Sequence, residues 1–142
     1  MGVPLYIVHR DGGFFMFQID IMSRTPVYEQ IVNQTEKFIM LGILKAGDKM
    51  PSVRQLAGEL SINPNTIQKA FTELDRRGII FAVNGRGNYV SEQAKKALEN
   101  SRRIAFAEVK EQIRDFALAG IDREEFHGLI DEVFDNLNGG RK

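Results

Sequence analysis

Two helix-start signals precede a hairpin signal between residues 51 and 90, and this order constrains the fold more than any other feature of the chain. Ser52 can cap a helix over residues 53–60, because its hydroxyl can accept from the N–H of Gln55, whose side chain can reach back in a capping box. Asn63 can cap a second helix that has Pro64 at its first position. That helix carries an apolar stripe and a glycine terminator: Ile67, Ala70, Phe71, Leu74 and Gly78. Two short helices joined by a tight turn are typical of a helix-turn-helix.

A hairpin is predicted directly after the second helix. Residues 79–83 are a continuous apolar run, Asn84-Gly85 is a strong turn signal, and residues 88–90 return as a second strand. At the tip, Arg86 stands between two glycines, Gly85 and Gly87, so a phosphate can approach the backbone closely. The predicted fold is therefore a winged helix-turn-helix, mainly α with a small β-hairpin.

Polar side chains remain on the outer face of the second helix once its apolar stripe faces the core. They are short and uncharged or singly basic, which suits base edges and phosphates: Asn65, Thr66, Gln68, Lys69 and Thr72. This pattern favours a helix that reads double-stranded DNA. The alternative is a helix-turn-helix that contacts another protein, in which Arg54, Lys69 and Arg86 are only surface charges. Salt-dependent binding to a duplex distinguishes the two.

The run from Thr25 to Val90 resembles the winged-helix domain of GntR-type bacterial transcription regulators. The motifs that carry the resemblance are the lead-in LKAGDKMPS, the helix PSVRQLA, the NPNT turn and the NGRGNYV wing. The NPNT form and the short tail resemble the YtrA subfamily in particular. The resemblance implies a repressor of an operon for an ABC-type transporter.

The resemblance also implies roles for single residues. Arg54 matches the family arginine that contacts DNA, Thr66 matches the phosphate-binding threonine, and Arg86 matches the wing tip that enters the minor groove. Pro64 and Gln68 stand where many relatives carry arginines that read guanine. We therefore expect this chain to share the binding mode of those relatives but not their operator sequence. The predicted DNA interface comprises Ser52, Arg54, Asn63, Asn65, Thr66, Gln68, Lys69, Gly85, Arg86 and Gly87.

The chain divides into three predicted parts: an extension over residues 1–24, the winged helix over 25–91 and a helical region over 92–142. In the extension, residues 3–8 and 14–21 can be strands joined by a turn at Asp11-Gly12-Gly13. Alternatively, translation starts at Met16 and the residues before it are a translated leader. In that case the Gly12-Gly13 pair can be the in-frame reading of a ribosome-binding site. The mass of the protein from its native host shows whether translation starts at Met16.

The first predicted helix begins after Thr25. Thr25 is the expected cap, Pro26 the first helical residue and Glu29 the capping-box carboxylate, and the helix ends at Gly42.

Two further helices are predicted after the wing. Ser91 can cap a long helix that reaches Ala119, and Asp122 with Glu125 forms a capping box for a last helix that ends before Asn138. Their apolar faces have no internal core to cover, so we expect them to form a homodimer, with an intramolecular helical hairpin as the alternative. A dimer in turn requires an inverted repeat. The predicted dimerisation residues are Phe106, Val109, Ile113, Phe116, Phe126, Ile130, Val133 and Phe134.

Charge and composition narrow the class of protein. The formal net charge is zero, but residues 24–91 hold nine Lys and Arg against six Asp and Glu, so DNA affinity should depend on a few placed cations and on dimer formation. The chain has no cysteine, and no segment resembles a secretory signal or a transmembrane span. We therefore expect a cytoplasmic protein.

Enzymatic chemistry has little support in the sequence. The two histidines, His9 and His127, have no catalytic Ser, Cys or carboxylate setting, so we expect no enzyme and no cofactor. Glu124, His127 and Asp131 share one helix face and could hold a divalent cation, although a solvated face is the simpler interpretation, so no metal is predicted. A ligand-gated sensor would have little room for a pocket outside the dimer interface. No small-molecule effector can be identified from the sequence.

Overall fold

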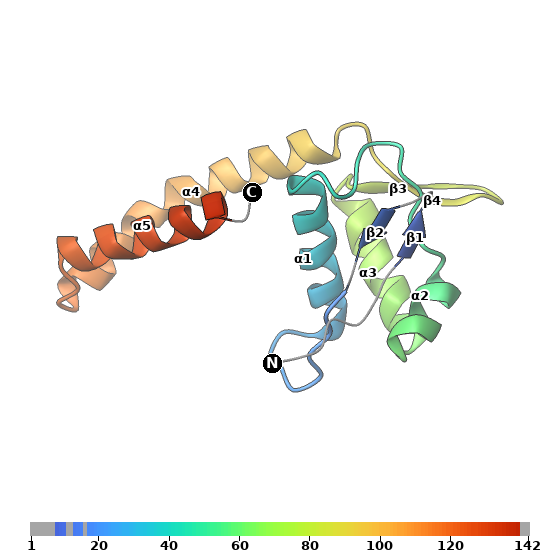
Figure 1. Cartoon of the computed structure of the whole chain (residues 1–142), viewed down its shortest axis with the longest axis horizontal. Helices are drawn as coiled ribbons and strands as arrows, with labels where there is room; N and C mark the ends of the chain where they lie inside the picture. Colours follow the sequence, from blue (N-terminus) through green and yellow to red (C-terminus); the bar gives the residue numbers. More distant parts are fainter. Residues whose placement is uncertain (1–7, 11–12, 16, 140–142) are drawn as a thin grey trace. The chain divides into compact units, whose positions relative to one another are not determined.

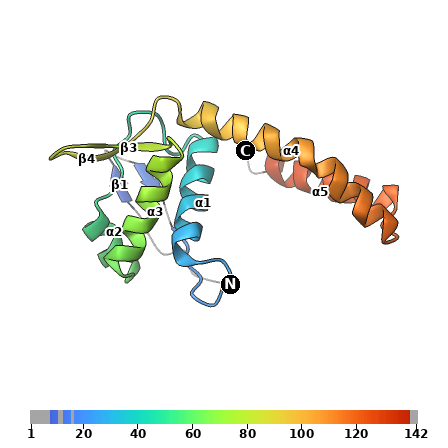
Figure 2. The same ribbon diagram turned by 180° about the vertical axis from the view of Figure 1, so that it is seen from behind.

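The computed structural model describes residues 8–10, 13–15 and 17–139, and Figures 1 and 2 show it from two opposite sides. The chain forms two compact units, residues 1–101 and residues 102–142. The expected fold class, a winged helix-turn-helix followed by two helices, is confirmed. In chain order the elements are β1 (Val8–Arg10), β2 (Gly13–Phe15), α1 (Val27–Met40), α2 (Val53–Leu60), α3 (Pro64–Arg76), β3 (Ile80–Val83), β4 (Gly87–Val90), α4 (Ala94–Leu118) and α5 (Arg123–Gly139).

Both helices of the helix-turn-helix begin where the sequence predicts. The hydroxyl of Ser52 accepts from the N–H of Gln55 at 3.0 Å, and the side chain of Asn63 accepts from the N–H of Asn65 at 2.8 Å. Each such cap contributes about 1 kcal/mol. The second half of the predicted capping box is wrong, because the Gln55 amide donates to Glu59 at 3.2 Å instead of reaching back to Ser52.

The turn between α2 and α3 contains a left-handed residue that is not glycine. Ser61 has φ 54° and ψ 43°, a conformation that costs a non-glycine residue roughly 1–2 kcal/mol. With Ser61 in this left-handed conformation, the N–H of Ile62 donates to the carbonyl of Ala57 at 3.0 Å. The half-buried Ile62 side chain packs against the core. This turn therefore sets the angle at which α3 leaves α2.

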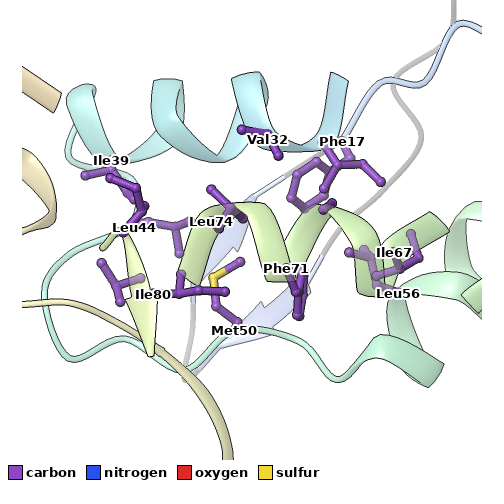
Figure 3. Packing of buried hydrophobic residues seen from close by; sticks show 14 of the residues in the cluster. Phe17, Val32, Ile39, Leu44, Met50, Leu56, Ile67, Phe71, Leu74 and Ile80 are labelled. Atoms are coloured by element: carbon purple, nitrogen blue, oxygen red, sulfur yellow. The ribbon is translucent and has the colours of Figure 1, made fainter. Parts of the chain in front are cut away.

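The buried side of α3 packs against α1 and α2 (Figure 3). The predicted stripe is confirmed, since Ile67, Ala70, Phe71 and Leu74 are each at most 2% exposed. Full burial of one aliphatic or aromatic side chain contributes roughly 1.5–3 kcal/mol, so the stripe determines which face of α3 turns outward. Their buried neighbours come from α1, α2, the wing and the segment between α1 and α2: Ile31, Val32, Ile39, Leu44, Met50, Leu56 and Ile80.

The hairpin is confirmed to within one residue at each strand. β3 and β4 are antiparallel, with Ile80 opposite Val90 and Val83 opposite Gly87. The three residues 84–86 form the turn, and the N–H of Arg86 donates to the carbonyl of Val83 at 3.0 Å.

The segment before α2 pairs with β4 of this hairpin, a contact that was not predicted from the sequence. The N–H of Met50 donates to the carbonyl of Asn88 at 2.8 Å, and the N–H of Val90 donates to the carbonyl of Asp48 at 2.8 Å. Between them, Lys49 pairs with Tyr89 as an isolated antiparallel bridge. The wing is therefore held to the lead-in by backbone hydrogen bonds.

The N-terminal part differs from the prediction. β1 and β2 pair as an antiparallel hairpin, with Val8 opposite Phe15. The strand predicted over residues 14–21 is wrong beyond Phe15, because residues 17–20 have no regular secondary structure. The rest of the predicted hairpin, residues 3–7 and 11–12, and the proposed start at Met16 lie outside the described residues.

Residues 17–20 are fastened to α1 by glutamine side chains. The Gln34 amide accepts from the N–H of Gln18 at 2.7 Å and donates to its carbonyl at 2.6 Å, and Gln30 makes the same pair of bonds with Asp20, each at 2.9 Å. Phe17 is fully buried in the core of the winged helix. This segment therefore packs as part of the winged-helix unit.

The predicted start of α1 is wrong in detail. Pro26, not Thr25, occupies the N-cap, and no side chain caps the helix. The carbonyl of Thr25 instead accepts from the Gln30 amide at 2.8 Å. The helix ends at Met40, and Gly42 follows with φ +75°.

The last two helices also depart from their predicted ends. α4 begins at Ala94 and not directly after Ser91, whose hydroxyl accepts from the N–H of Gln93 at 3.2 Å in the turn before the helix. The capping box of α5 is confirmed, since Asp122 and Glu125 bond each other's backbone N–H at 3.0 and 3.2 Å. α5 continues through Gly139, so the prediction that it ends before Asn138 is wrong.

Candidate nucleic-acid interface

The outer face of α3 is polar over the length of the helix. The side chains of Asn65, Gln68, Lys69 and Thr72 are exposed, and Thr66 is half-buried. The Gln68 amide lies 3.4 Å from the Thr72 hydroxyl, a long contact that leaves most of its donors and acceptors available. The face therefore offers amides, hydroxyls and one ammonium group.

Lys69 is held by an aromatic ring on α1. Its Nζ lies 3.9 Å from the centroid of the Tyr28 ring, a cation–π contact. The Tyr28 hydroxyl donates to Glu29 at 3.0 Å, and this hydrogen bond raises the pKa of Tyr28 above its ordinary value. Tyr28 therefore directs the Lys69 side chain towards the first turn of α1, a contact that joins two separate helices and has no signal in the local sequence.

Three other predicted interface residues lie at the starts of α2 and α3. Arg54 is exposed in the first turn of α2 and forms no ion pair with the described part of the chain. Ser52 and Asn63 already use a side-chain oxygen as a helix cap, so only their remaining hydrogen-bonding capacity is open to a ligand.

The wing tip has the conformation that its two glycines allow. Gly85 has φ +73° and Gly87 has φ +108°, both unfavourable for other residues. Arg86 between them is exposed. The turn thus presents one guanidinium group between two residues that have no side chain.

The far end of α3 is fixed by ion pairs. Arg77, at the C-cap, bonds Glu73 one turn back at 2.8 Å and the nearly buried Glu36 of α1 at 2.7 Å. Arg76 bonds Glu73 at 2.6 Å, and these two guanidinium groups, Arg76 first, lower the pKa of the Glu73 carboxyl to about 2. Arg76 and Arg77 are therefore engaged with carboxylates, and the outward face described above is the candidate DNA surface.

The second unit consists of helices whose large apolar side chains are exposed. Phe106 is 76% exposed, Ile113 42%, Phe116 54% and Phe134 61%. Phe116 and Phe126 approach each other across the turn between α4 and α5, with ring centroids 6.5 Å apart. The remaining predicted dimerisation residues are half-buried or exposed: Val109, Phe126, Ile130 and Val133.

No three His, Cys, Asp or Glu side chains gather as a metal site among residues 8–10, 13–15 and 17–139. The same residues include no helix with the length and apolar character that a membrane span needs.

A helix-turn-helix with a polar outer face on its second helix and a cationic hairpin tip defines the class of winged-helix DNA-binding regulators. Residues 27–90 match the model of the bacterial regulatory proteins of the gntR family. The chain belongs to this GntR family.

Its relatives include proteins that match most of its length. It is 45% identical to the HTH-type transcriptional repressor YtrA of Bacillus subtilis, over 89% of this chain and 98% of that protein. A GntR family transcriptional regulator from Listeria monocytogenes shares 36% identity and a TM-score of 0.65 over 80% of this chain and 98% of the solved one. YtrA from Sulfolobus acidocaldarius, a GntR-family transcription factor, shares 36% identity and a TM-score of 0.56 over 67% and 97%. These relatives are named as transcription regulators, and they confirm the YtrA-like resemblance.

Proposed function

We propose that the chain is a sequence-specific transcription regulator that binds an inverted repeat in double-stranded DNA as a homodimer. The observation that carries the proposal is the outer face of α3, where amides, hydroxyls and one ammonium group are exposed above a fully buried apolar stripe. Amide side chains pair with base edges in the major groove through one donor and one acceptor. A face used only for solvation would carry more Glu and Lys.

Within the interface, some residues position the protein and others read the sequence. Arg54 and Thr66 lie in the first turns of α2 and α3, where backbone N–H groups and the helix dipole favour phosphate. Asn65 and Gln68 are the exposed amides near the start of α3, and each can pair bidentately with adenine. Arg86 enters a minor groove and favours A·T-rich flanks, where that groove is narrow.

The homodimer is supported by the apolar side chains of α4 and α5. Many large apolar side chains of α4 and α5 are exposed, and pairing the helices of two copies would cover them. A hairpin within one chain leaves most of these side chains exposed, as the exposed fractions of Phe106 and Phe134 indicate.

A repressor is the regulatory role that the relatives favour. The B. subtilis relative with 45% identity is named a transcriptional repressor. Control of an operon for an ABC-type transporter rests on the subfamily resemblance, and the genes next to the coding sequence test it. The competing class, a protein-binding winged helix, predicts no salt-dependent binding to duplex DNA.

Replacing Arg54 by Ala should weaken binding to operator and random DNA alike. Because Arg54 contacts phosphate, the slope of log affinity against log salt should fall in magnitude by about one per bound copy. Fluorescence anisotropy at several salt concentrations measures this slope. Lys37→Ala, which removes an exposed cation from the last turn of α1, is the control and should leave the slope unchanged.

Replacing Gln68 by Ala should act on the operator only. The loss of a bidentate base contact costs about 1 to 3 kcal/mol on the operator, leaves nonspecific binding nearly unchanged and relaxes the preference at one base pair per half-site. The same anisotropy assay, with Gln93→Ala as the control for an exposed amide outside α3, measures both affinities. Equal losses on operator and random DNA would contradict the reading role of α3.

A further inference from the structure

The wing region holds a second exposed cation, Lys49, besides Arg86. Lys49 belongs to the segment before α2, not to the hairpin, and pairs with Tyr89 of β4 as an antiparallel bridge. Backbone hydrogen bonds fix both of its neighbours, because Asp48 accepts from Val90 and Met50 donates to Asn88, each at 2.8 Å. The backbone of Lys49 therefore has a defined place beside β4.

The Lys49 side chain runs towards the wing tip. Its Cε lies 3.3 Å from the position that a Cβ on Gly87 would occupy, so the end of the aliphatic stem lies beside the residue directly after Arg86. Gly87, with φ +108°, is the residue whose missing side chain leaves space for this stem. The glycine therefore shapes the tip and also leaves space for a lysine side chain from the segment before α2.

The Lys49 charge is not neutralised within the described part of the chain. No carboxylate among residues 8–10, 13–15 and 17–139 forms an ion pair with it, whereas Arg76 and Arg77 at the end of α3 are both paired. An exposed lysine without a carboxylate partner can take a phosphate oxygen without first breaking an ion pair. Lysine suits a backbone phosphate better than a base edge, because it is a point charge on a flexible stem.

We propose that Lys49 binds a backbone phosphate beside the groove that Arg86 enters. Each wing then holds the duplex through two cations, Arg86 of the hairpin turn in the groove and Lys49 of the segment before α2 on its edge. The proposal rests on the proposed DNA-binding function and adds a contact that positions the wing without reading sequence. The simpler alternative is a lysine that only protects an exposed sheet edge from pairing with another chain.

Replacing Lys49 by Met tests the proposal, because Met keeps an apolar stem over Gly87 and removes the charge. Binding of the full chain to a random-sequence duplex of about 30 base pairs, roughly three helical turns, is measured by anisotropy across a range of salt concentrations. We expect the salt slope to fall in magnitude by about one per bound copy. Lys49→Arg should restore it, and Lys37→Met should leave it at the wild-type value.

The outcomes separate this inference from the function on which it rests. If the wild-type protein shows no salt-dependent binding to the duplex, the proposed function fails. If the wild type binds and Lys49→Met has the same slope and affinity, the function stands and the phosphate contact is overturned. A variant that loses affinity at an unchanged slope, with a lowered midpoint of thermal unfolding, assigns Lys49 a structural role and also overturns the proposal.

Discussion

Replacing Phe17 by Ala is expected to lower the free energy of unfolding by about 3 to 5 kcal/mol, the usual cost of emptying a phenylalanine site in a core. The ring is fully buried and meets Phe38 edge-on, with centroids 5.4 Å apart. The residue after it is bonded to Gln34 through both its N–H and its carbonyl, which limits how far the chain can move to fill the cavity. Since a domain of this size has only about 5 to 15 kcal/mol of stability, this loss is large.

Urea unfolding followed by circular dichroism measures the effect of the Phe17 substitution. Ile21→Ala is the matched control, because Ile21 lies four residues further along the same segment and is 79% exposed. The control should change the free energy of unfolding by no more than about 0.5 kcal/mol. Equal stability of the two variants would mean that residues 17–20 do not pack in the core.

Replacing Ile113 by Asp should separate the proposed dimer. Ile113 lies on the apolar surface of α4 that Phe106 and Val109 also form. In the proposed dimer this surface is covered, so a carboxylate without a partner there costs several kcal/mol, and a two-fold interface contains the substitution twice. Because every 1.4 kcal/mol is tenfold, the dimer dissociation constant should rise at least about 100-fold.

Analytical ultracentrifugation at low micromolar concentration distinguishes dimer from monomer. Gln112→Asp introduces the same charge one position away, on another face of α4, and should remain dimeric. Without the dimer, the two half-sites are no longer bound together, and affinity for the operator should fall by about 10²- to 10⁴-fold. If the Ile113→Asp protein is as dimeric as the control, the dimer interface does not include this part of α4.

The helix-turn-helix and the wing could be predicted because their signals are local. Ser52, Asn63, Pro64 and Gly78 mark helix ends by short-range hydrogen bonds and backbone preferences, and each occupies the predicted place. The apolar stripe of α3 repeats at helical spacing, so its buried face, and with it the outward face, followed from the sequence.

The contacts that were not predicted from the sequence join segments that are far apart along the chain. Gln30 and Gln34 bond the backbone of residues 18–20, and no helix pattern signals that two glutamine amides will fasten a preceding segment. Tyr28 and Lys69 meet only once α1 and α3 have packed. Lys49 becomes a wing residue only through its pairing with Tyr89, which is 40 positions further along the chain.

Two predicted helix starts were also wrong, although each had a residue with a capping side chain. Thr25 has the side chain of a cap, yet its carbonyl is used by Gln30 and Pro26 takes the N-cap. The Ser91 hydroxyl accepts from the N–H of Gln93 in a turn, and α4 begins two residues later than it would if Ser91 were the N-cap. Ala94 and Leu98, on the first turns of α4, are buried.

Selection of binding sites from a pool of random duplexes tests whether the chain binds an inverted repeat that α3 reads. The full chain is mixed with the pool, and the bound duplexes are recovered and sequenced. We expect an enriched inverted repeat with half-site centres about one helical turn, roughly 34 to 36 Å, apart, and a repeat relaxed at one base pair per half-site for Gln68→Ala. A pool that is not enriched, or enriched sites without two-fold symmetry that Gln68→Ala leaves unchanged, would contradict it.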